Sequence, residues 1–162
     1  MELKDDSDFK NRKIVVAEAL LQSVINDCKI KNYKKIKTFK GKELKETICN
    51  HPFFDLGYEY DIPMLNARFV TTEQGTGIVH CAPSHGPDDF NLCLNNGIKA
   101  IETVDGDGKY TKHVSLFEGI HIFKANPIVI EKLKEQKKLL SNGELMHSYP
   151  HSWRSKAPLV HR

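Results

Sequence analysis

The sequence predicts an α+β fold with a β-barrel-like body and short helices at its periphery. Three observations favour this class. About six short segments have the β-branched and aromatic composition of strands. Three segments carry helix signals, and they do not alternate with the strands as a βαβ fold requires. The 162 residues are enough for one domain with a hydrophobic core, so a single domain over residues 1–162 is expected.

The composition is that of an ordinary globular protein, with 40% hydrophobic and 28% charged residues. No apolar run is long enough to span a bilayer, and the opening MELKDDSDFK is too polar for a signal peptide. The four cysteines form no CxxC pair, which favours reduced thiols over a disulfide framework or a zinc knuckle. These features predict a cytoplasmic protein that does not bind membranes. The formal net charge of +3 does not by itself indicate nucleic-acid binding.

The N-terminal part predicts a strand at Lys13–Ala17, a short amphipathic helix at Ala19–Ile25 and then a lysine-rich strand. Lysine occurs eight times between Lys29 and Lys45, and the alternation in YKKIKTFKG suits a strand with its charged face outward. This face is either a surface that contacts phosphates or simply the solvated side of a lysine-rich protein.

The middle of the chain begins with the aromatic, turn-rich segment HPFFDLGYEYDIPM, which predicts loops and one strand. Neighbouring strands are expected at Asn66–Val70 and Gly77–Ala82, with a tight connection at Thr71–Gly75. A helix is expected to begin at Pro87, because proline suits the first helical position, and to end before Gly97.

The C-terminal part predicts a strand at Ala100–Val104 and a hairpin turn at Asp105–Gly108. The clearest helical pattern covers Ala125–Leu140, with Asn126 as a cap and Pro127 in its first turn. His147 and His151 are four residues apart, but Pro150 between them disfavours a metal site on a helix. The ending HSWRSKAPLVHR has no cap or stop signal, and we expect the chain to be a piece of something longer.

The segment GTGIVHCAPSHGPDDF, from Gly75 to Phe90, concentrates the side chains that can do chemistry. Its glycines permit positive φ or a close approach to a ligand, and Ile78 and Val79 favour a short buried strand that carries His80. The loop after the strand leads to a helix whose first turn holds Asp88 and Asp89. Such a segment is either a functional site or an ordinary strand, loop and capped helix.

The motif TTEQGTGIVHCAPSHGPDDF resembles the core motif of the editing domain of isoleucyl-tRNA synthetases. The later segments VDGDGKYT, FEGIHIFKAN and HSYPHSWRSKAPLVHR are similar to the same family and follow in the same order. The resemblance runs from Lys13 to Arg162. It implies the large insertion in the synthetase's catalytic domain, with residues 145–162 leading back towards that domain, and the remainder of the synthetase and the acceptor end of tRNA(Ile) as partners.

The implied activity is hydrolysis of valine wrongly esterified to tRNA(Ile). A hydrophobic pocket distinguishes one methylene by only about 1–3 kcal/mol, so a second site is needed to remove valine; this enzyme class is the standard example of that limit, and the magnitude is not a result from this chain. The resemblance implies ATP and magnesium for the full-length synthetase and no cofactor for this fragment.

The resemblance also implies roles for individual residues. Asp89 matches the aspartate that binds the α-ammonium group of the misattached amino acid, where an ionised carboxylate gives a charge-assisted hydrogen bond. His80 matches the histidine that lines the pocket and excludes isoleucine by size, and these two form the expected catalytic set. The remaining candidates are expected to bind substrate, and they are Thr71, Thr72, Gly75, Thr76, Gly77, His85 and Asp88. Of these, Asp88 is better interpreted as a first-turn cap.

The expected mechanism is ester hydrolysis by a positioned water, because no nucleophilic triad, reactive cysteine or metal cluster is visible. Two features depart from the family. Its threonine-rich segment lies before the region where this chain begins, so an isolated fragment is expected to edit poorly. Ser152 and Ser155 replace two cysteines that contribute to a zinc site in many relatives, and serine hydroxyls are poor zinc ligands, so no metal is predicted.

Two alternatives stay open. The lysine-rich face permits a non-catalytic module that docks tRNA on the synthetase. The chain could also edit another amino acid, as the related valyl enzymes do.

Overall fold

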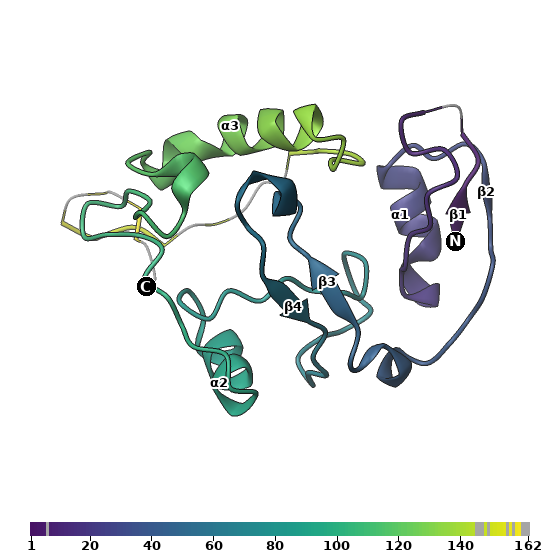
Figure 1. Ribbon diagram of the computed structural model, residues 1–162, viewed down its shortest axis with the longest axis horizontal. Coiled ribbons are helices and arrows are strands. Elements are labelled where there is room, and N and C mark those ends of the chain that lie inside the picture. The colour runs from purple at the N-terminus through teal and green to yellow at the C-terminus, as the bar shows by residue number, and fades with distance from the viewer. Residues whose placement is uncertain (6, 145–147, 149, 155, 157, 160–162) are drawn as a thin grey trace. The chain divides into compact units, whose positions relative to one another are not determined.

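The computed structural model describes residues 1–5, 7–144, 148, 150–154, 156 and 158–159 (Figure 1). The chain divides into two compact units, one comprising residues 1–80 and 130–142 and the other residues 81–129 and 143–162. The described residues contain three α-helices and four short strands, so the predicted α+β class is confirmed.

The first unit begins with a small core around an antiparallel pair of strands. Strand β1 (Glu2–Leu3) pairs with β2 (Tyr33–Lys34), and Leu3 lies opposite Tyr33. A 3-10 turn at Glu18–Leu20 leads into α1 (Leu21–Asp27), so the predicted first helix is confirmed, with both of its boundaries two residues later than predicted. The buried side chains that hold these elements together are Leu3, Ile25 and Ile30, with Met1, Phe9, Ile14, Leu21, Cys28 and Leu140 packed around them.

A hairpin forms the other half of this unit. Strand β3 (Ile48–Asn50) pairs with β4 (Asp61–Pro63) in antiparallel register, with Asn50 opposite Asp61. The 3-10 turn η2 (Gly41–Leu44) precedes β3, and η3 (Phe54–Leu56) lies in the connection between the two strands (Figure 1). The prediction of loops and one strand for residues 51–64 is therefore confirmed.

In the second unit, helix α2 (Pro87–Asn95) begins and ends where the sequence predicts. Proline occupies its first turn, and Gly97 adopts φ +74° after its last turn. The Gly97 and Ile98 amides donate to the carbonyls of Leu94 and Cys93, which is a Schellman ending. The Asp105–Gly108 turn is also confirmed, because the Asp105 amide donates to the Lys109 carbonyl and Val104 bridges to Tyr110.

Helix α3 (Ile122–Glu135) starts three residues before the predicted Ala125 and ends five before Leu140, so both boundaries were wrong. His121 starts it, since its Nδ1 accepts a hydrogen bond from the Phe123 amide at 3.3 Å. Pro127 lies inside the helix and not in its first turn. In the helix interior it removes one backbone hydrogen-bond donor. The helix ends in a Schellman motif at Lys137, whose φ is +52°.

Several predicted strands are absent from the described residues. Lys13 makes only an isolated bridge to Glu2, and only two residues of the lysine-rich segment pair as β2. The structure forms no strand at residues 66–70, 77–82 or 100–104. The physical reason is that β composition favours a strand only where a partner strand satisfies the backbone, and these segments are held by turns and single hydrogen bonds instead.

The two sheets of the described part have two strands each and close no barrel, so the barrel-like body is not confirmed. The single-domain interpretation stays a prediction. Among the described residues, no helix is both long enough and apolar enough to cross a membrane. In the predicted tail, His147 and Ser155 lie outside the described residues, whereas His151 is described and makes a bridge to Pro158.

Candidate functional site

The GTG turn in the first unit is fixed by its backbone and by one close neighbour. Gly75 and Gly77 both have positive φ, +74° and +79°, which glycine adopts at little cost. The Thr76 carbonyl accepts a hydrogen bond from the Ala17 amide at 2.8 Å. A Cβ placed on Gly77 would lie 2.5 Å from the Ala17 Cβ, so only glycine fits here. The sequence marks both glycines as special but gives no sign that Ala17 is the partner.

The residues around this turn are exposed, contrary to the prediction of a buried strand. Ile78 is 41% and Val79 52% exposed, and His80, Thr71 and Thr72 are also exposed. Thr76 uses its own hydroxyl locally, accepting from the Ile78 amide and donating to the Ile78 carbonyl. The exposed surface of this segment therefore combines two apolar side chains, Ile78 and Val79, with polar threonines and one imidazole.

In the second unit, Asp89 connects helix α2 to the loop before it. Its Oδ2 accepts a hydrogen bond from the Ala82 amide at 2.8 Å, and the His85 amide closes the loop on the Ala82 carbonyl. Asp89 is half-buried, whereas Asp88 is exposed in the same first turn. Both aspartates lie in the first turn of α2, where negative charge favours the helix dipole, and Asp89 also makes a specific contact; their predicted roles stay predictions.

Two thiols lie close to Asp89 and remain protonated. Burial raises the pKa of Cys81, and the charge of Asp89 raises it further. Burial and then Asp89 act in the same direction on the pKa of Cys93, which is buried on α2. Neutral thiols are poor nucleophiles, so this geometry favours a structural role for both cysteines over covalent catalysis.

The Asp89 carboxylate retains acceptor capacity. An ionised carboxylate has about four lone-pair sites, and the Ala82 amide occupies one of them. The group can therefore bind a cation such as an ammonium while it still holds the loop. Among the described residues, no cluster of three or more histidine, cysteine or acidic side chains has the geometry of a metal site.

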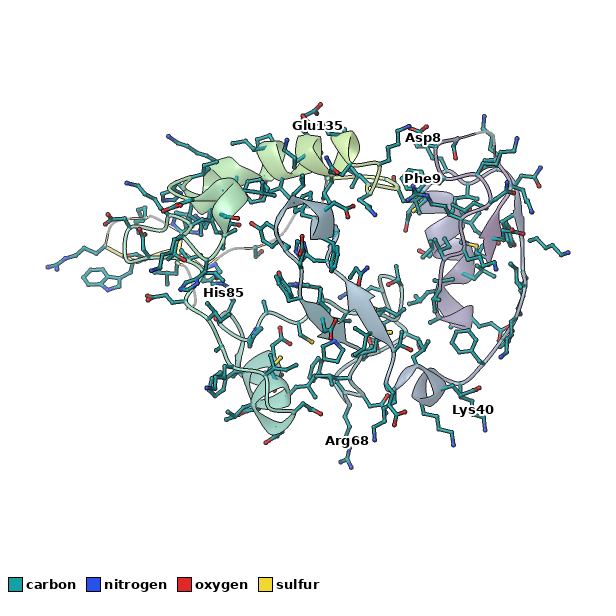
Figure 2. The ribbon with its side chains drawn as sticks, in the orientation of Figure 1. Asp8, Phe9, Lys40, Arg68, His85 and Glu135 are labelled. Atoms are coloured by element: carbon teal, nitrogen blue, oxygen red, sulfur yellow. The ribbon has the colours of Figure 1, made fainter. Side chains whose placement is uncertain are left out.

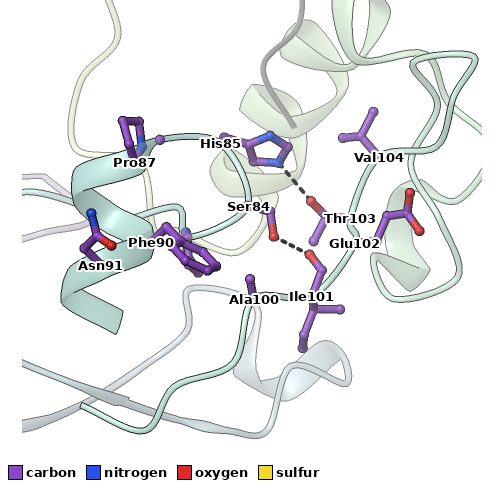
Figure 3. Close-up of a pocket in the computed structure, with 12 residues that line it drawn as sticks. Ser84, His85, Pro87, Phe90, Asn91, Ala100, Ile101, Glu102, Thr103 and Val104 are labelled. Atoms are coloured by element: carbon purple, nitrogen blue, oxygen red, sulfur yellow. Dashed lines mark hydrogen bonds between the residues drawn. The ribbon is translucent and has the colours of Figure 1, made fainter. Parts of the chain in front are cut away.

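An open pocket of about 760 Å³ lies beside this loop (Figure 3). One wall is the loop from Pro83 to Pro87 with Phe90 and Asn91 of α2, and the other is the segment from Ala100 to Val104. His85 points across to Thr103, with Nε2 and Oγ1 2.9 Å apart, and the Ser84 hydroxyl donates to the Ile101 carbonyl (Figure 3). Thr103 is a partner that the sequence analysis missed, because nothing local marks it.

The structure divides the predicted site residues between the two units. Thr71, Thr72, the GTG turn and His80 belong to the first unit, and His85, Asp88 and Asp89 to the second. Of these, His85 lines the pocket and Asp89 does not. The predicted roles of all of them in binding and catalysis stay predictions.

Known proteins match this chain along all or nearly all of its length. No protein-family model matches it. A protein from Pelagibacter ubique is 84% identical over 162 residues, covering 100% of this chain and 18% of the relative. A second from Gluconobacter oxydans is 44% identical over 93% of the chain, and a third from Hahella chejuensis is 41% identical over 96%. These relatives are isoleucine–tRNA ligases.

The chain thus matches a segment of isoleucine–tRNA ligases and spans about 18% of the length of the first of these relatives. The match covers the GTG turn, the loop and helix α2, since all 162 residues align with the Pelagibacter ligase. The resemblance deduced from the motifs is confirmed at this level.

Proposed function

We propose that this chain is the editing domain of an isoleucine–tRNA ligase and that it hydrolyses the ester of valine misattached to tRNA(Ile). The observation that carries the proposal is the GTGIVHCAPSHGPDDF motif within a chain that aligns over its full length with such a ligase. The half-buried Asp89 carboxylate is the anchor for the α-ammonium group of valine, because a fixed anion with spare lone pairs suits a cation.

In this proposal, hydrolysis depends on positioning. Asp89 holds the amino group, His80 limits the size of the side chain, and a water attacks the ester carbonyl. His80 and Asp89 act without forming a covalent intermediate, which agrees with the protonated thiols near Asp89. The remainder of the synthetase and the acceptor end of tRNA(Ile) are the partners that this function requires.

The decisive test compares two substitutions of Asp89 in the full-length enzyme. Asp89→Asn keeps an oxygen that can accept from the Ala82 amide but removes the charge, so it separates ammonium binding from loop structure. We expect Asp89→Asn and Asp89→Ala both to abolish deacylation of valyl-tRNA(Ile), with aminoacylation largely kept. Asp88→Ala, on the same helical turn, should keep most of the deacylation. Full deacylation by Asp89→Asn would overturn the role of Asp89.

A second candidate is a non-catalytic module that docks tRNA. It is favoured by one observation: all eight lysines between Lys29 and Lys45 are exposed. Lysines neutralise phosphate charge without reading sequence. If the wild-type enzyme binds tRNA(Ile) but does not clear valyl-tRNA(Ile), docking is the better interpretation. Measuring threonyl- beside valyl-tRNA hydrolysis distinguishes an editing domain of the valyl type.

A further inference from the structure

The connection between β3 and β4 carries a cluster of four rings, His51, Phe53, Tyr58 and Tyr60. The His51 and Tyr58 rings are stacked, with centroids 4.7 Å apart and an interplanar angle of 16°. Tyr60 completes the cluster, with its centroid 5.7 Å from that of His51 and 6.2 Å from that of Tyr58. Phe53 is the fourth ring of the cluster, and its centroid lies 5.6 Å from that of His51 and 6.1 Å from that of Tyr58.

The cluster is rigid but only partly buried. Phe53 and Tyr58 are buried, whereas Tyr60 is 51% exposed. A hydrogen bond holds the His51 ring in place, because its Nδ1 accepts from the Phe53 amide at 3.0 Å. Burial lowers the pKa of His51, and the nearby charge of His80 lowers it further, so the ring is neutral at pH 7. The result is a fixed aromatic surface whose outer ring, Tyr60, faces solvent.

Basic residues flank this hairpin, together with Glu43 and Glu46. Lys40, Lys42 and Lys45 lie in and beside η2, directly before β3, and all three are exposed (Figure 2 labels Lys40). Arg68 follows β4 and is exposed as well. Glu59 and Asp61 flank Tyr60 in the sequence, and both are exposed.

We propose that Tyr60, supported by His51 and Tyr58, is a stacking platform for an unpaired nucleobase of a single RNA strand. Single-stranded nucleic acids are bound by aromatic rings that stack on bases beside basic residues that track the backbone, and this hairpin provides both. The platform and the GTG segment belong to the same unit. The inference deepens the proposed function, since a tRNA acceptor end is such a strand.

The test uses the full-length enzyme and a short single-stranded RNA that contains one 2-aminopurine, a base whose fluorescence falls on stacking. We expect the wild-type enzyme to bind and quench the probe. Tyr60→Leu should weaken binding about tenfold and remove the quenching, because stacking on one ring contributes about that much, whereas Tyr60→Phe should retain both. Phe69→Leu is the matched control, since Phe69 is an exposed aromatic residue of the same unit outside the cluster.

The proposal is overturned if the wild-type enzyme does not quench the probe, or if Tyr60→Leu binds it as tightly as the wild type. An equal loss in Phe69→Leu or in Tyr60→Phe also overturns it, because the effect would then not be stacking on this ring. Its failure is separable from that of the proposed function. Asp89→Asn should bind the probe as tightly as the wild type, because Asp89 is not part of the platform. If that variant also deacylates valyl-tRNA normally, editing at Asp89 is refuted, whereas the stacking proposal is unaffected.

Discussion

Replacing Gly77 by alanine tests the packing of the GTG turn. The added Cβ would meet two penalties. At φ +79°, alanine costs about 1–2 kcal/mol relative to glycine. The Cβ would also lie 2.5 Å from the Ala17 Cβ, far inside the contact distance of two methyl groups, and relieving such overpacking costs about 1–3 kcal/mol. We therefore expect Gly77→Ala to destabilise this region by about 2–5 kcal/mol.

Gly75→Ala is the matched control. Gly75 has nearly the same φ, +74°, but a Cβ there meets nothing within 4 Å. Gly75→Ala should therefore lose only the backbone contribution, about 1–2 kcal/mol. The difference between the two variants isolates the clash with Ala17.

The assay combines urea unfolding, followed by far-UV circular dichroism, with hydrogen exchange of the Ala17 amide, which donates to Thr76. A loss of about 2–5 kcal/mol lowers the urea midpoint by about 1–2.5 M if the denaturant slope is about 2 kcal/mol/M. Ala17→Gly in the Gly77→Ala background should recover part of the loss, because it removes the other methyl group. If Gly77→Ala and Gly75→Ala are equally stable, or if Ala17→Gly recovers nothing, the packing argument is refuted.

Two further predictions concern stability. Helix α1 ends in a Schellman motif at Lys29, whose φ is +53°. Lys29→Gly should therefore increase the free energy of unfolding in urea by about 0.5–1 kcal/mol, because glycine adopts this φ at little cost. Lys31→Gly removes the same charge at a residue whose φ is not positive, and it should give no gain. The pKa of His51 is lowered on folding from 6.5, so the unfolded chain binds more protons below that pH and stability should fall as the pH drops through about 6.5. His51→Phe should flatten this pH dependence, and an unchanged slope would contradict the assigned cause.

Local signals in the sequence predicted the elements that depend on local chemistry. Pro87 and Gly97 bound α2 because one fixes φ at a helix start and the other takes a left-handed φ at its end. The Asp105–Gly108 turn formed as expected, since Asp105 Oδ1 accepts hydrogen bonds from two amides within the same turn. The boundaries of α3 were wrong because the cap is the His121 ring, which no capping rule selects, and because a helix can tolerate one missing donor at Pro127.

The sequence alone determined the α+β class and the GTG turn, and its motifs pointed to the relatives that the comparisons found. The tertiary structure decided which residues meet across long separations: Ala17 with Gly77, and Thr103 with His85. It also decided which β-rich segments pair, since only four short strands found partners among the described residues. The reason is physical: turns and caps are satisfied within a few residues, whereas strand pairing and close packing depend on groups that the chain brings together only when it folds.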